Sequence, residues 1–231
     1  SGGKVVCAFG KVVCDSGVPV DGGPAHRSMA DWLNHTVATV AGSRTLLLVK
    51  PHPHERRNEI GAFLTETFED LIEVPRSDNV RVLGHDWFDM ADLEGVIDLG
   101  LVYNGTSAIE LGLLGIPAIL CSHYASLDYP IGQCVPRDRA HYERLIRFEE
   151  AAEVAPDLPL RAAAWLHYLS GDERIKDYRY HARPITNRSI NPPWWFEDDL
   201  AAHRSERDPA IASLADEITV PGVNHSNVRK I

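Results

Sequence analysis

Apolar and polar residues alternate from residue 4 to about residue 121 in blocks that fit a repeated strand-and-helix pattern. In residues 28–41, apolar side chains return every three or four positions, which predicts an amphipathic helix. Residues 45–50 (TLLLVK) form a compact apolar run, as expected of a strand that is buried on both faces. Pro51 and Pro53 follow this run directly and end the predicted strand.

Shorter patterns extend this alternation. They predict further strands at residues 4–8, 11–14, 80–83, 98–103 and 117–121, and helices at residues 57–71, 90–93 and 107–114. Strands that alternate with helices are typical of the α/β class, so we predict a Rossmann-like parallel sheet with helices on both faces. Ligands bind such sheets at the carboxyl ends of the strands. Functional residues are therefore expected in the loops after Lys50, Leu83, Tyr103 and Cys121.

The pattern changes near residue 140. Helices are predicted at residues 142–152 and 160–170, whereas residues 175–196 are polar and aromatic and residues 198–231 are weakly patterned. We therefore predict a Rossmann-like domain over residues 1–139. A helical extension and tail over residues 140–231 is expected to pack on it.

Composition narrows the classes of partner and location. The 231 residues carry a formal net charge of −10 and no large basic cluster, so a nucleic-acid partner is not expected. No apolar run approaches the roughly 20 residues of a membrane span, and no secretory signal precedes the first strand. The four cysteines lack CxxC spacing, which favours reduced, mostly buried thiols. We expect a cytoplasmic protein, either free or peripheral at the inner face of a membrane.

The loop after residues 45–50 carries Lys50, His52 and His54 between two prolines. Lys50 can place an ammonium near a phosphate, and His52 can donate a hydrogen bond or a proton to a leaving phosphate. The prolines restrict the backbone that carries the imidazole. Two alternatives stay open: a proline-rich turn with an exposed histidine, and a metal-dependent hydrolase in which His52 and His54 bind one metal ion.

The loop after residues 98–103 reads Asn104, Gly105, Thr106, Ser107 and leads into a helix that contains Glu110. Backbone N–H groups at a helix start suit a phosphate, and Gly105 allows close approach while Thr106 and Ser107 add hydroxyl donors. Glu110 can accept hydrogen bonds from ribose hydroxyls. The alternative is ordinary helix capping, with Asn104 or Thr106 as the N-cap and Glu110 in a capping box.

Two further loops contain polar residues that suit contacts with a base or a sugar. His85 and Asp86 follow the strand at residues 80–83, and His123 and Tyr124 follow the strand at residues 117–121. We treat these four residues as candidate base or sugar contacts. A packed loop is the competing interpretation for the first pair.

The segments LLLVKPHPHE, VRVLGHDW and DLGLVYNGTSAIELGLLGIPAILCSHY together resemble a known family. They are similar to the carboxy-terminal, donor-nucleotide-binding half of GT-B glycosyltransferases of capsule polysaccharide synthesis. The nearest likeness is to the Kdo transferases, with bacterial sialyltransferases more distant, and it covers about residues 4–129. By this resemblance His52 and Pro53 match a His-Pro motif and Thr106 and Ser107 a Ser/Thr motif, both of which bind the phosphate of a CMP-sugar. Glu110 matches a ribose-binding acid.

The resemblance implies a nucleotide-sugar-dependent glycosyltransferase of bacterial surface polysaccharide, with a CMP-sugar as donor and a glycan or glycolipid as acceptor. His52 and Lys50 would then act in catalysis, with no metal or other cofactor required. A GT-B enzyme has two Rossmann-like halves, and these residues match only one. We therefore expect an acceptor-binding half or a partner domain that supplies the rest of the site. A nucleotide-binding module without catalysis remains an alternative.

Overall fold

The computed structural model describes residues 3–15, 20–62, 64–85, 89–170 and 201. The chain divides into two compact units, residues 1–166 and residues 167–231. The sheet and all the site residues discussed below belong to the first unit. This unit extends beyond the predicted domain boundary at residue 139, because residues that follow the boundary contribute to its core.

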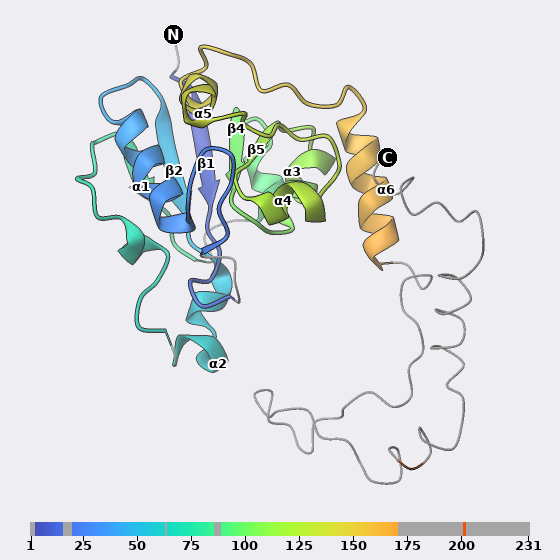
Figure 1. Cartoon of the computed structure of the whole chain (residues 1–231), viewed down its shortest axis with the longest axis horizontal. Coiled ribbons are helices and arrows are strands. Elements are labelled where there is room, and N and C mark those ends of the chain that lie inside the picture. The colour runs from blue at the N-terminus through green and yellow to red at the C-terminus, as the bar shows by residue number, and fades with distance from the viewer. Residues whose placement is uncertain (1–2, 16–19, 63, 86–88, 171–200, 202–231) are drawn as a thin grey trace. The chain divides into compact units, whose positions relative to one another are not determined.

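Five parallel strands form the single sheet of this unit that the structure describes (Figure 1). Their order across the sheet is β3-β2-β1-β4-β5. The strands are β1 (Val5–Phe9), β2 (Leu46–Lys50), β3 (Val80–Val82), β4 (Leu99–Val102) and β5 (Ala118–Leu120). This confirms the predicted Rossmann-like α/β class. The strand order reverses between β1 and β4, and such a switch point is where open α/β sheets bind ligands.

Helices cover both faces of the sheet. On one face, α1 (Met29–Val40) and α5 (Arg139–Ile146) pack into a core that includes Trp32, Phe68 and Tyr142. On the other face, the 3-10 helix η4 (Met90–Leu93), α3 (Ser107–Leu113) and α4 (His123–Asp128) contribute to a second core. In Figure 1, α1 lies beside β2, and α3 lies beside β4 and β5. Both faces are therefore buried, which explains the continuous apolar runs of the strands.

A buried polar network fixes α5 against α1. The Trp32 Nε1–H donates to the Tyr142 hydroxyl at 2.9 Å, and that hydroxyl also bonds with Thr36 Oγ1 at 2.6 Å. All three residues are fully buried. The start of α1 matches the prediction closely, because Ser28 caps the helix by accepting from the Asp31 N–H at 3.2 Å.

Two predictions of local structure were wrong. Residues 11–14 form a turn instead of a strand, closed by a hydrogen bond from Asp15 N to Val12 O. In place of a helix at residues 57–71 there are η2 (Pro53–Arg56), α2 (Asn58–Gly61) and η3 (Glu69–Leu71). A straight helix would separate residues 55 and 68 by about 20 Å. Instead, the Glu55 carboxylate accepts the Phe68 N–H at 2.8 Å, which requires the chain to fold back.

The remaining predicted elements are present with shifted ends. α5 (Arg139–Ile146) begins before the predicted start at residue 142 and ends before the predicted end at residue 152. Asp138 sets its start by accepting from the His141 N–H at 2.7 Å. α6 spans Leu158–Ser170. The predictions for residues 175–196 and 198–231 lie outside the described residues. Among the described residues, no helix is long and apolar enough to cross a membrane. The four cysteines are free thiols, and all but Cys14 are buried.

Candidate functional site

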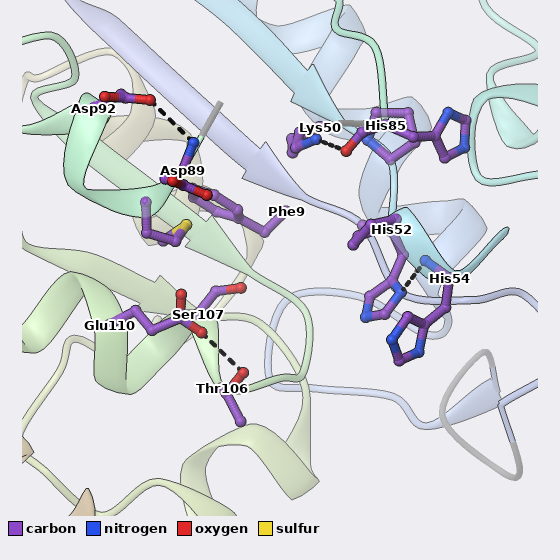
Figure 2. A pocket seen from close by; sticks show the side chains of 14 residues that line it. Phe9, Lys50, His52, His54, His85, Asp89, Asp92, Thr106, Ser107 and Glu110 are labelled. Atoms are coloured by element: carbon purple, nitrogen blue, oxygen red, sulfur yellow. Dashed lines mark hydrogen bonds between the residues drawn. The ribbon is translucent and has the colours of Figure 1, made fainter. Parts of the chain in front are cut away.

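A cavity of about 750 Å³ opens at the carboxyl edge of the sheet, where the ends of β1, β2 and β3 meet the starts of η4 and α3 (Figure 2). Its wall brings together the two loops that the sequence singles out. The lining residues are Phe9, Gly10, Lys50, Pro51, His52, Pro53, His54, His85, Asp89, Met90, Asp92, Thr106, Ser107 and Glu110. In Figure 2, His52 and His54 lie on one side of the cavity, across from Thr106, Ser107 and Glu110. Residues of both loops therefore line one cavity.

His52 is held by the turn that it begins. It is the N-cap of η2, and its Nδ1 accepts a hydrogen bond from the His54 N–H at 3.2 Å. Pro53 occupies the first turn, where its missing N–H costs nothing. The rings of His52 and His54 meet edge to face with their centroids 4.8 Å apart. Since Nδ1 is an acceptor, the ring proton of neutral His52 is assigned to Nε2.

The electrostatic surroundings keep His52 uncharged at neutral pH. Burial lowers the pKa of the imidazole to about 4, and the nearby His54, Lys11 and Arg57 act in the same direction, while Asp15 acts against them. A neutral imidazole donates a hydrogen bond through Nε2 but adds no positive charge. In the ligand-free protein at neutral pH, His52 therefore presents a hydrogen-bond donor and no positive charge to the cavity.

Lys50 lines the cavity at the end of β2, but its ammonium is engaged by the protein. Its Nζ donates to Gly84 O at 2.9 Å and, at close range, to His85 O. The residue is only 9% exposed. The structure therefore differs from the expectation of an ammonium directed at a phosphate, because Lys50 ties the end of β2 to the loop that follows β3.

On the opposite wall, α3 begins without side-chain capping. Thr106 is the N-cap residue in a helical conformation, and no side-chain hydrogen bond caps the helix. Thr106 is therefore the N-cap residue, as the capping interpretation allows, but the side-chain hydrogen bonds of that interpretation are absent. The Thr106 hydroxyl instead donates to Glu110 Oε1 at 3.0 Å. α3 has seven residues, so its dipole is small, and this wall offers the hydroxyls of Thr106 and Ser107 and the carboxylate of Glu110.

Several predicted residues lie beside the cavity or away from it. Gly105 has a φ of 143°, a conformation that favours glycine, and shapes the loop without lining the cavity. Asn104 is buried behind it. His123 and Tyr124 are exposed at the start of α4 and do not line the cavity. The Tyr124 N–H donates to Asp21 Oδ2 at 3.0 Å. Asp86 lies outside the described residues.

His85 reaches the cavity through the loop after β3, and both of its ring nitrogens have protein partners. Nε2 lies 3.0 Å from Glu55 Oε2, and Nδ1 lies 3.1 Å from the Arg56 Nε–H. In Figure 2 its ring is turned away from the side that carries Thr106 and Ser107. The imidazole therefore anchors the loop and offers no free nitrogen to a base or sugar.

Sequence reasoning missed part of the wall. Phe9 and Gly10 at the end of β1 line the cavity, as do Asp89, Met90 and Asp92 in and before η4. The strand order places the end of β1 at the switch point, but this order cannot be read from a list of strands. The glycine that breaks the apolar run at residue 10 is the one signal of this wall that the sequence offers.

The wall carries more negative than positive charge. Three carboxylates, those of Asp89, Asp92 and Glu110, face one ammonium, that of Lys50. Asp89 and Asp92 also accept each other's backbone N–H groups in a capping box. Among the described residues, no group of three or more histidine, cysteine or acidic side chains is placed to hold a metal ion. These carboxylates, which can accept hydrogen bonds from the hydroxyl groups of a ligand, therefore lie across the cavity from the imidazole of His52.

Of the comparisons with known proteins, the one with solved structures finds similar chains. No family model matches this chain, and no curated protein does. Among solved structures, the calicheamicin glycosyltransferase CalG4 shares 15% identity over 73% of this chain and 40% of that chain, with a TM-score of 0.39. The spinosyn rhamnosyltransferase SpnG shares 16% over 71% and 41%, with a TM-score of 0.39. The glycosyltransferase SnogD from Streptomyces nogalater shares 13% over 74% and 38%, with a TM-score of 0.37.

The chain spans about two fifths of the length of these structures. The Rossmann-like fold is established by the parallel sheet and its strand order.

Proposed function

We propose that the chain is the donor-binding part of a nucleotide-sugar-dependent glycosyltransferase, with a CMP-sugar as donor and a bacterial capsule or surface glycan as acceptor. The observation that carries the proposal is the shared cavity at the switch point, which His52 enters from one side and Thr106 and Ser107 enter from the other. The resemblance of both loops to the phosphate-binding motifs of capsule glycosyltransferases supports it.

In this proposal the phosphate of the donor lies between the His52 turn and the start of α3. His52 donates through Nε2, and the hydroxyls of Thr106 and Ser107 donate from the opposite wall. For Thr106 this requires its hydroxyl to rotate away from Glu110. Donors placed where charge develops on a leaving phosphate lower the barrier to transfer. Lys50 contributes by fixing the wall, and Glu110 accepts from hydroxyls of the nucleotide.

The proposal includes a second half that binds the acceptor. The resemblance covers only the donor-binding half of a GT-B enzyme, so the acceptor half would come from a partner or from another domain. That half would also supply the general base. We place the assembled enzyme in the cytoplasm, either free or at the inner face of the membrane, with no metal ion required.

Calorimetry of the whole chain with CMP, CDP, UDP and GDP tests this proposal. We expect CMP to bind most tightly. We expect His52→Ala to weaken CMP binding by roughly tenfold to a hundredfold, the value of one hydrogen bond to a charged group. His123→Ala is the matched control, because His123 is exposed and does not line the cavity. If none of the four nucleotides binds, the proposal is wrong. If another nucleotide binds best, only the choice of CMP is wrong.

Turnover measured in the presence of the acceptor-binding partner distinguishes the enzyme from a nucleotide-binding module without catalysis. In an enzyme, His52→Ala lowers turnover by orders of magnitude, whereas in a pure binding module it lowers affinity alone.

A further inference from the structure

Glu55 is a buried acid on the same short turn as His52 and His54. Its side chain is fully buried, with 0% exposure. Oε1 accepts the Phe68 N–H at 2.8 Å, and Oε2 pairs with His85 Nε2 at 3.0 Å. One carboxylate thus joins three segments: η2, the chain just before η3, and the loop after β3. Such a residue is costly to bury unless both of its oxygens are satisfied, as they are here.

The turn that carries His52 has little stability of its own. η2 is four residues long, and the hydrogen bonds that close it are Glu55 N to His52 O at 3.1 Å and Arg57 N to His54 O at 3.0 Å. A 3-10 turn has poor hydrogen-bond geometry and is short for that reason. The placement of the His52 imidazole therefore depends on what anchors the turn to the rest of the cavity wall.

Hydrogen-bond geometry shows why the anchor is a carboxylate. Arg56 can only donate, so its Nε–H makes His85 Nδ1 an acceptor. The proton of neutral His85 then lies on Nε2 and points to Glu55. The Phe68 N–H is also a donor, so both oxygens of Glu55 accept hydrogen bonds. Burial raises the pKa of the Glu55 carboxyl, and the bonds from His85 and Phe68 oppose this by favouring the charged form.

We propose that Glu55 is a positioning residue: it fixes the tautomer of His85 and clamps the His52 turn to the loop after β3, so that His52 faces the donor phosphate. The proposal rests on the proposed function for the role of His52, but the clamp itself can be tested without a ligand. Glu55 does not line the cavity, so it acts only through its neighbours.

The test begins with Glu55→Gln. The Phe68 N–H and the His85 ring each use a different oxygen of Glu55, and a glutamine replaces one of these two oxygens with an NH2 donor. Its amide would instead present a donor to His85 Nε2. The ring would have to move its proton to Nδ1, where the Arg56 donor opposes it. Long-range ¹H–¹⁵N spectra of the ligand-free chain report this tautomer directly. We expect the Nε2–H form of His85 in the natural sequence, its loss in Glu55→Gln, and a shift of the His52 ring signals in the same variant.

A second variant separates positioning from simple loss of stability. Arg56→Met removes the donor at Nδ1, so that in the double variant His85 can change tautomer and accept from the amide introduced by Glu55→Gln. We expect Arg56→Met alone to bind CMP nearly as well as the natural sequence, because Arg56 is exposed. Glu55→Gln should bind about tenfold or more weakly, and the double variant should recover most of that loss. Glu143→Gln is the matched control, since Glu143 pairs with His35 at 3.0 Å outside the cavity.

The outcomes are distinct. Unchanged His85 and His52 spectra in Glu55→Gln would overturn the clamp whether or not a nucleotide binds. If CMP binds Glu55→Gln and the natural chain equally, the positioning role is overturned while the proposed function stands. If the natural chain binds no nucleotide, the proposed function fails, and the ligand-free spectra still decide on the clamp. Should Glu55→Gln not fold, Glu55→Asp, which keeps both acceptors on a shorter side chain, is measured in the same way.

Discussion

His52 is expected to bind an anion more tightly as the pH falls. Burial holds its pKa at about 4 in the ligand-free protein, so the ring is neutral at pH 7. A single negative charge about 4 Å from the ring attracts the protonated form by roughly 4 kcal/mol at an effective dielectric constant of about 20. That attraction raises the proton affinity of the ring by up to about a thousandfold.

Part of this gain is offset, because a proton on Nδ1 breaks the hydrogen bond from the His54 N–H. We therefore expect the affinity for a phosphodiester to rise by roughly tenfold to a hundredfold between pH 8 and pH 5. The sign follows from proton uptake: only the complex gains a proton in this range. The rise levels off near pH 4, where the ligand-free imidazole is protonated as well.

The assay is calorimetry with a methyl ester of CMP, whose phosphate carries one charge across the whole range. Titration in two buffers that differ in ionisation enthalpy gives the number of protons taken up. His54→Ala should retain the pH dependence, since the bond to His52 comes from the backbone of residue 54. His52→Ala should abolish it. A flat affinity between pH 5 and pH 8, or an equal slope in His52→Ala, would refute the reasoning.

Three further predictions concern the scaffold. Gly10→Ala should destabilise the protein by about 1–3 kcal/mol in urea unfolding, because the added Cβ would lie 2.5 Å from the buried Phe68 ring. Tyr142→Phe should cost about 1–3 kcal/mol by leaving the Trp32 N–H without its acceptor. Acid should also destabilise the fold. Burial lowers the pKa of His26 from 6.5 to about 3. The unfolded chain therefore binds a proton first, and stability that is complete above pH 7 falls by about 2 kcal/mol by pH 5. His26→Gln should remove most of that fall.

The five strands of the sheet are predicted from the sequence because local patterns identify them. Residues 45–50 are apolar throughout and are followed by prolines, so both the strand and its end are set locally. The start of α1 is equally local, since Ser28 caps the helix whose apolar positions recur with helical spacing. The place of His52, Thr106 and Ser107 at strand ends follows from the same pattern. Their convergence then requires only that the strands run parallel in one sheet.

The rest depends on contacts between distant segments. No local pattern reveals that Glu55 binds the backbone of Phe68, yet this bond brings together residues that the predicted helix would hold far apart, and η2, α2 and η3 stand in its place. The same holds for Lys50, whose ammonium looks available in the sequence but is bound by carbonyls of the loop after β3. The end of β1 joins the cavity only because β1 lies at the centre of the strand order. Each of these features depends on tertiary contacts, which local sequence patterns do not show.

The charge of the cavity wall limits the class of ligand that the cavity can bind. The formal net charge of the chain is −10, and the wall of the cavity carries three carboxylates and one ammonium. The long-range electrostatic field therefore opposes the binding of an anion. Affinity must then come from short-range donors, of which each bond to a charged group contributes about 1.5–3 kcal/mol. A few donors near His52 suffice for one phosphate, but a highly charged ligand would meet the carboxylates of Asp89 and Glu110 without compensation. Those same carboxylates accept from hydroxyl groups. A ligand with one phosphate and many hydroxyls would satisfy both walls, which supports the proposed CMP-sugar over a polyphosphate.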